Sequence, residues 1–144
     1  MTTFVDTSAL YALLASDDSH HTAAAQTMAF LALGEDLVTH NYVIVECAAV
    51  VQRRIGALAV RALLDELVPL LRVVWIDPET HDRATTALMA TGSRTVSLVD
   101  WASFMVMRAF GIEHAFAFDS DFVAQGFRLV PPKQADVAPT EDER

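Results

Sequence analysis

The spacing of hydrophobic residues changes from that of a strand to that of a helix within the segment Thr3-Phe4-Val5-Asp6-Thr7-Ser8-Ala9-Leu10. Residues 3–5 are rich in strand-forming side chains, which predicts a short buried strand. Leucines at helical spacing follow over residues 8–15 and predict a helix. The chain therefore begins as a strand followed by a helix, with the carboxylate of Asp6 between them.

The same alternation continues along the chain. Further strands are predicted at residues 37–39, 72–76, 115–118 and 127–130. Helices are predicted at residues 21–33, 42–54, 57–68, 79–90 and 99–110. Strands separated by helices of this length imply a parallel sheet that is covered on both faces. We therefore expect an α/β fold.

The composition indicates one globular domain. The 144 residues are 53% hydrophobic, which is enough to bury a core. We expect the domain to span residues 1–130 and the segment 131–144, which lacks apolar periodicity, to be a disordered tail. No apolar stretch approaches the roughly 18 residues that span a membrane, and Cys47 is the single cysteine. A cytoplasmic protein is the expectation.

Three acidic residues occupy positions where a carboxylate has both an ordinary and a functional explanation. Asp6 and Asp119 follow predicted strands, where ligands of open parallel sheets bind, but an Asp between a strand and a helix is also a good N-cap. Asp100 ends the sequence Ser97-Leu98-Val99-Asp100, which matches the capping-box pattern. Its neighbours are apolar, so a cap and a metal ligand can coexist there.

Glu46 lies within an otherwise apolar helical stretch, residues 42–51. A buried carboxylate without a partner costs several kcal/mol. The ordinary explanations are an exposed helix face or an ion pair with Arg53, seven positions later. The other explanation is a functional site.

If these acids converge, they need a cation. Two carboxylates about 4 Å apart repel by about 4 kcal/mol at an effective dielectric near 20. Oxygen ligands of this kind suit Mg²⁺ or Mn²⁺. Zinc is less favoured, because Cys47 is alone and the His20-His21 pair lacks ligand spacing. The net charge of −9, unusual for a protein that binds nucleic acid, fits acids that hold metal or acidity that keeps the protein in solution.

Four motifs together resemble those of PIN domains, in the expected order. The opening segment, the helix around Glu46, Ser97-Leu98-Val99-Asp100 and Phe118-Asp119-Ser120-Asp121-Phe122 carry the resemblance. Residues 105–127 further resemble VapC toxins, the ribonuclease halves of bacterial VapBC toxin–antitoxin pairs. The resemblance covers about residues 1–130.

The resemblance implies a three-layer α/β/α sandwich around a mainly parallel sheet. It implies that Asp6, Glu46, Asp100 and Asp119 hold Mg²⁺ or Mn²⁺. Thr7 and Asp121 would support them, Asp121 as a further metal ligand. The family often has Thr or Ser two positions before the fourth-motif Asp, where this chain has Ala117. A hydroxyl that could orient Asp119 is therefore missing.

The implied reaction is metal-dependent hydrolysis of RNA by a metal-bound water. VapC-type toxins cut transfer RNAs or the sarcin–ricin loop of ribosomal RNA, and residues 97–127 resemble the second group. Arg53 and Arg54 are candidate RNA contacts, although arginines at a helix end also have an ordinary explanation. Other possible functions are a phosphatase-like hydrolase using Asp6, a DNA-directed nuclease and a non-catalytic PIN-type interaction module.

Surplus apolar surface predicts partners. The predicted helix at residues 99–110 is apolar nearly all round, so we expect a homodimer that uses it, unless the chain itself covers it. The leucine-rich helices at residues 8–15 and 57–71 are expected to form a groove for a helix of a VapB-type antitoxin. The antitoxin could then direct an arginine to the acidic site.

Overall fold

The computed structural model describes residues 1–133, so most of the predicted tail lies outside the described residues. Its five strands form one sheet in the order β3-β2-β1-β4-β5, and every neighbouring pair is parallel. The strands are β1 (Thr2–Val5), β2 (Asp36–His40), β3 (Arg72–Val74), β4 (His114–Phe116) and β5 (Arg128–Val130). The predicted parallel sheet is confirmed.

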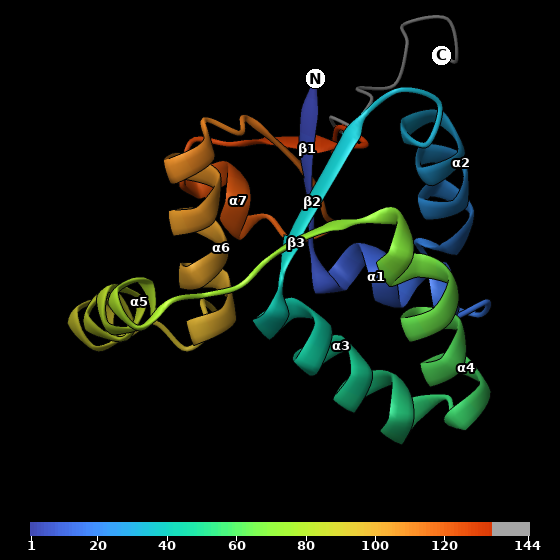
Figure 1. Cartoon of the computed structure of the whole chain (residues 1–144), viewed down its shortest axis with the longest axis horizontal. Coiled ribbons are helices and arrows are strands. Elements are labelled where there is room, and N and C mark those ends of the chain that lie inside the picture. The colour runs from blue at the N-terminus through green and yellow to red at the C-terminus, as the bar shows by residue number, and fades with distance from the viewer. Residues whose placement is uncertain (134–144) are drawn as a thin grey trace, which may run out of the picture.

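Helices cover both faces of this sheet (Figure 1). They are α1 (Thr7–Leu14), α2 (His21–Leu31), α3 (Asn41–Arg54), α4 (Ala57–Arg61), α5 (Pro78–Thr91), α6 (Leu98–Phe110) and α7 (Asp121–Ala124). Figure 1 shows α5, α6 and α7 on one side and α1, α2 and α4 on the other, which confirms the α/β/α sandwich. No helix in the described part of the chain has both the length and the apolar character needed to cross a membrane.

The central strands are buried on both faces. Phe4 and Val5 of β1, Val38 of β2 and Phe116 of β4 have no exposed surface. Such strands show continuous apolar runs rather than alternation, because both layers of helices need apolar contacts. The core therefore lies on both sides of β1, which is the middle strand of the sheet.

Two predicted elements differ in detail from the structure, and one observed helix was not predicted. The predicted helix at residues 57–68 is instead α4, a π-helical turn at Ala62–Leu67 and a 3-10 turn at Val68–Leu70. Pro69 lies at the start of that last turn, where its missing N–H is tolerated. The predicted strand at 72–76 has only three residues because it is an edge strand, paired on one side. Helix α7 was not predicted, since four residues are too few to show a helical period.

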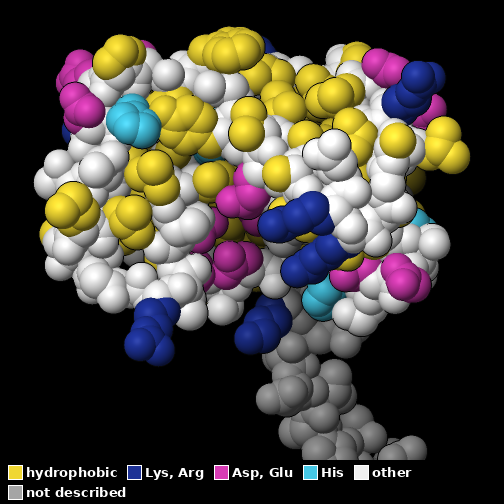
Figure 2. Space-filling view, turned by 90° about the horizontal axis from the view of Figure 1, so that it is seen from below, with side chains coloured by type: hydrophobic (Ala, Val, Ile, Leu, Met, Phe, Trp, Pro, Cys, Tyr) yellow, Lys and Arg dark blue, Asp and Glu magenta, His cyan; other side chains and the backbone are white. Residues whose placement is uncertain are grey.

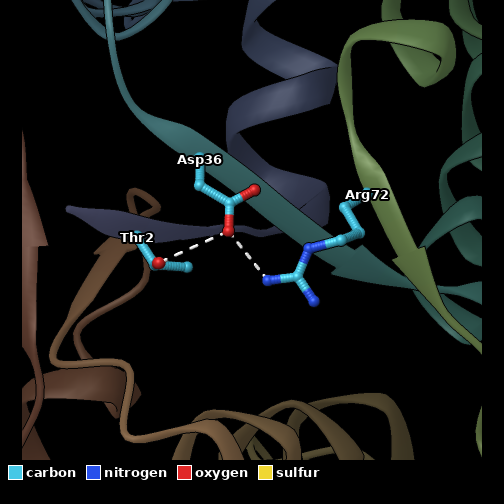
Figure 3. Close-up of polar contacts among 3 residues, drawn as sticks. All are labelled: Thr2, Asp36 and Arg72. Atoms are coloured by element: carbon cyan, nitrogen blue, oxygen red, sulfur yellow. Dashed lines mark hydrogen bonds and ion pairs between the residues drawn. The ribbon is translucent and has the colours of Figure 1, made fainter.

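Polar contacts join the amino ends of three strands (Figure 3). Asp36 accepts a hydrogen bond of 2.8 Å from Arg72 and one of 3.4 Å from Thr2. The bond from the Arg72 guanidinium lowers the pKa of the Asp36 carboxyl. Both charged side chains are about half exposed, so the pair contributes on the order of 0–1 kcal/mol. Its main effect is to link β1, β2 and β3 at the end of the sheet opposite to the acidic residues.

Helix α6 is largely covered by its own chain, which was the alternative to a dimer. Helix α5 packs along it, and Phe104 and Met107 have no exposed surface. Trp101 and Met105 are half-buried. Phe110, at the C-terminal end of the helix, remains 52% exposed. Less apolar surface is therefore left for a second subunit than the sequence alone indicates.

Candidate metal centre

Asp6 lies at the carboxyl end of the middle strand. It is the N-cap of α1, and its Oδ2 accepts hydrogen bonds from the Ser8 backbone N–H at 3.1 Å and the Ser8 hydroxyl at 2.6 Å. Only 4% of Asp6 is exposed. The capping role considered for this residue is present, and it leaves the second carboxylate oxygen without a hydrogen bond from the described residues.

Ser8 connects the acidic segment that follows β1 with the one that follows β4. Its Oγ donates to Asp6 and accepts from the Phe118 backbone N–H at 3.0 Å. Phe118 immediately precedes Asp119, so one hydroxyl holds both acidic segments. The family resemblance implied the supporting role for Thr7, whose buried hydroxyl has no hydrogen-bond partner among the described residues. The contact of Ser8 is with a residue 110 positions away, and no local sequence signal predicts it.

Three further carboxylates meet beside this segment. Asp100, Asp119 and Asp121 each place a carboxylate oxygen within 4.8 Å of the others. Asp100 comes from the first turn of α6, where it forms the predicted capping box with Ser97. The Asp121 backbone N–H donates to Asp119 Oδ1 at 2.9 Å. That bond orients Asp119 in place of the hydroxyl that Ala117 lacks.

The pKa shifts show that the acids share one electrostatic environment. Burial raises the pKa of Asp6 to about 7, helped by the charges of Asp100 and Asp119 and opposed by the bonds from Ser8. Burial also raises the pKa of Asp100 to about 6, with contributions from Asp119 and Glu46. The pKa of Asp121 is raised by burial and by Asp119. Figure 2 shows acidic side chains gathered in a hollow at the carboxyl end of the sheet.

Glu46 reaches this environment from α3. It is half-buried, and it makes no hydrogen bond or ion pair with the described residues. Glu46 does not form the ion pair with Arg53 that would have given it an ordinary structural role. The one ion pair among residues 1–133 joins Arg72 and Asp36. The charge of Glu46 acts on Asp100. Asp100, Asp119 and Asp121 therefore lie within ligand distance of one another, and Asp6 and Glu46 are near enough for their charges to interact with this group.

A buried histidine links the two helices that carry Glu46 and Asp100. His40 Nδ1 caps α3 by accepting from the Val43 N–H at 3.3 Å. Its Nε2 therefore carries the proton and donates to Ser103 Oγ at 2.8 Å, and Ser103 donates to the Val99 carbonyl at 2.9 Å. Burial lowers the pKa of His40 to about 4, so the ring is neutral at pH near 7. No local sequence pattern indicates this hydrogen-bonded chain from His40 through Ser103 to Val99.

Arg53 and Arg54 are exposed at the C-terminal end of α3. The Arg54 guanidinium lies 5.6 Å from the centre of the Tyr11 ring, and neither arginine forms an ion pair with the described residues. Figure 2 shows basic side chains beside the acidic hollow. Basic groups along the edge of an acidic centre suit a substrate that carries phosphates.

The donor set fits a hard divalent cation. The converging ligand atoms are all carboxylate oxygens, which suit Mg²⁺ or Mn²⁺. Burial is the largest cause of the raised pKa values of Asp6 and Asp100, and the charges of neighbouring acids raise them further, so a cation at this centre would favour the ionised carboxylates. His20 and His21 are engaged elsewhere, His20 stacked on Phe118 and His21 hydrogen-bonded to the Ala12 carbonyl. Among the described residues, no histidine or cysteine joins this carboxylate group, so its ligands are not those that zinc prefers.

Comparisons with known proteins agree with this geometry. The PIN domain family model matches residues 3–127. The 23S rRNA-specific endonuclease VapC20 of Mycobacterium tuberculosis is 37% identical over 131 residues, which are 90% of this chain and 98% of that protein.

Solved structures show the same fold. The crystal structure of Mycobacterium tuberculosis VapC20, described as a sarcin–ricin loop cleaving toxin, has a TM-score of 0.77 and 34% identity, covering 88% of this chain and 96% of that one. The VapBC2 structure from Rickettsia felis, bound to a DNA fragment from its promoter, has a TM-score of 0.67 at 13% identity, covering 90% of this chain and 97% of that one. At that identity the second likeness concerns the fold alone. The family match and the VapC20 relative show that this chain belongs to the PIN-domain family and, within it, to the VapC-type endonucleases.

Proposed function

We propose that this chain is a Mg²⁺-dependent endoribonuclease toxin that cleaves the sarcin–ricin loop of 23S rRNA. The observation that carries the proposal is the carboxylate group of Asp100, Asp119 and Asp121, with buried Asp6 in its electrostatic reach, in a chain 37% identical to a 23S rRNA-specific endonuclease. The similar solved structure is named for cleavage of that loop. Ribosomes lie in the cytoplasm, where we expect the toxin to act.

In this proposal Asp6, Glu46, Asp100, Asp119 and Asp121 hold Mg²⁺ or Mn²⁺. When bound, the metal would supply a water of lowered pKa and neutralise charge on the phosphoryl oxygens. Ser8 holds Asp6 and the Phe118 backbone in place, which fixes the spacing of two acidic segments. Arg53 and Arg54 would contact RNA phosphates at the edge of the centre.

The proposal includes a VapB-type antitoxin. Leu58, Leu64 and Leu70 are 84%, 43% and 57% exposed, on the segment predicted to receive an antitoxin helix. Leu13 and Leu14 of α1 are half-buried. An amphipathic helix would bury these leucines, and an arginine from the antitoxin would pair with the acidic cluster.

The proposal is tested with purified protein and a hairpin RNA of the 23S sarcin–ricin sequence. We expect cleavage at one position with Mg²⁺ and none with EDTA. Asp100→Asn should abolish cleavage while the capping bond from the Ser97 N–H survives, because an amide oxygen can still accept it. Asp82→Asn removes an exposed carboxylate on α5 and should leave the rate unchanged. Equal rates for Asp100→Asn and the unaltered protein would refute the mechanism.

Metal binding has a second readout that does not depend on cleavage. Mg²⁺ or Mn²⁺ should raise the melting temperature, because the cation relieves repulsion in the folded state only. The rise should be smaller in Asp100→Asn than in Asp82→Asn. Hairpin binding without cleavage under any metal would instead favour the non-catalytic interaction module.

A further inference from the structure

A second hollow lies next to the metal centre. Its volume is about 710 Å³, and it opens at the carboxyl ends of β4 and β5 against the first turns of α2. The polar and aromatic side chains that line it are those of His20, Gln26, Thr27, Phe118, Ser120 and Lys133. Pockets of this size accept ligands as large as a nucleotide. None of these side chains belongs to the carboxylate cluster described above.

The hollow and the metal centre share one segment of chain. Phe118 and Ser120 line the hollow, and Asp119 between them belongs to the carboxylate cluster. The Phe118 backbone is tied to Asp6 through Ser8. When a phosphate of the substrate reaches the carboxylates, the nucleotide next to that phosphate therefore lies beside the hollow.

A stacked pair of rings lies at the hollow and leaves an outer ring face for a further stacking partner. The His20 imidazole is stacked on the Phe118 ring with centroids 4.4 Å apart and an interplanar angle of 14°. His20 is exposed, and its side chain makes no capping hydrogen bond to α2. Aromatic and imidazole rings of this kind are where proteins stack unpaired bases of RNA.

The remaining groups provide hydrogen bonds and charge. Gln26, Thr27 and Ser120 offer donors and acceptors to the edge of a base, and Lys133 offers a positive charge to a phosphate. We propose that the hollow binds one unpaired nucleobase of the substrate RNA, extruded from its loop next to the phosphate that is cleaved. The proposal rests on the proposed function and adds the site that selects the position of the cut.

The experiment uses the full chain carrying Asp100→Asn, so that the hairpin is bound but not cut. Each unpaired position of the sarcin–ricin hairpin is replaced in turn by 2-aminopurine or by an abasic residue. We expect 2-aminopurine to be quenched on binding at one position, because there it stacks on the outer face of the ring pair. An abasic residue at that position should weaken binding roughly 5- to 150-fold, the range for loss of one base–aromatic stack.

His20→Ala and Phe30→Ala are then compared in the same background. Phe30 is an exposed aromatic residue at the other end of α2 and does not line the hollow. We expect His20→Ala to remove the quenching and to weaken binding as much as the abasic residue does, with no further loss when both changes are combined. His20→Phe keeps a ring and should restore quenching, whereas Phe30→Ala should change nothing.

The outcomes separate this proposal from the proposed function. One outcome would overturn the proposal alone. The unaltered protein cuts the hairpin, but at every position the abasic residue weakens hairpin binding by the same factor for His20→Ala and for the Asp100→Asn parent. The hollow then does not hold a base, and the proposal is wrong. If His20→Ala melts at a lower temperature, His20→Phe still decides whether the ring itself is required. A protein that neither binds nor cuts the hairpin would overturn the proposed function together with this site.

Discussion

At the scale of single residues, Asp6 is a buried carboxyl group whose pKa lies above that of Asp100. Its pKa in the folded chain is about 7, against an ordinary value of 3.8. Between these two values the folded state holds a proton that the unfolded state has lost. The stability of the metal-free protein should therefore fall as pH rises from about 4 to about 7, and should change little above that from this group.

Asp6→Asn should remove this dependence. From the size of the pKa shift, ionised Asp6 destabilises the folded, metal-free protein by at most about 4 kcal/mol above pH 7. In EDTA, we expect Asp6→Asn to melt at a higher temperature than the unaltered protein at about pH 8 and at a similar temperature near pH 4. Asp82→Asn serves as the control. Equal melting temperatures for Asp6→Asn and the unaltered protein at the higher pH would show that Asp6 is not destabilising.

Ser8 is expected to matter more than Thr7. Ser8→Ala removes the donor to Asp6 and leaves the Phe118 N–H without its acceptor. Loss of a group that orients a metal ligand typically lowers metal affinity or activity 10- to 100-fold, by order of magnitude. Thr7→Val should cost less, because the Thr7 hydroxyl has no partner among the described residues. Mg²⁺ titrations of hairpin cleavage measure both effects, and the reverse order would return the supporting role to Thr7.

The sequence identifies acids more readily than their supports. Asp6, Asp100 and Asp119 stand at strand ends and a helix start, and Glu46 interrupts an apolar stretch, so each is visible in its local surroundings. Ser8 is also local to Asp6, but its second contact depends on how β1 and β4 pair. The sequence pattern does not show which strands pair, so it does not predict this second contact of Ser8.

At the scale of elements, α3 and α6 are held together by a buried polar chain. His40 caps α3 and donates to Ser103, which donates to Val99 in the first turn of α6. Glu46 and Asp100 lie on these two helices. The spacing of the two carboxylates therefore depends on a neutral imidazole that does not belong to the acidic cluster.

Ser103→Ala should weaken this connection. It leaves the His40 Nε2–H buried without an acceptor, at a cost of about 1–3 kcal/mol. We expect a lower midpoint in urea unfolding and a weaker response to Mg²⁺. Thr86→Ala is a matched control, since its hydroxyl also donates to a carbonyl four residues earlier but is exposed. A change in Ser103→Ala no larger than that in Thr86→Ala would contradict the role of the chain.

Predicted elements fail where tertiary structure overrides the local period. The apolar spacing at residues 57–68 is helical, yet the structure changes to a π-helical turn that buries Leu63. Helix α7 begins at Asp121, whose N–H bonds to Asp119, so its start depends on the acidic segment rather than on apolar spacing. The long helices α3 and α6 show enough turns to be predicted almost to their ends.

At the scale of the whole molecule, the remaining question is the second subunit. Helix α5 covers much of α6, but Phe110 stays 52% exposed and Met89 on α5 is 78% exposed. We expect a homodimer that buries Phe110. Light scattering at micromolar concentration should give twice the monomer mass, and Phe110→Ser should lower it. A monodisperse monomer in the absence of antitoxin would exclude this dimer.

The strand order also has a consequence for how the toxin is made. The middle strand β1 is synthesised early, whereas its neighbour β4 and the edge strand β5 come late in the chain. Asp119 and Asp121 therefore cannot join Asp6 until these last strands have left the ribosome and paired. In the proposed function, a complete centre would form only after β4 and β5 have been synthesised, whereas the leucine-bearing helices α1 and α4 precede these strands in the chain.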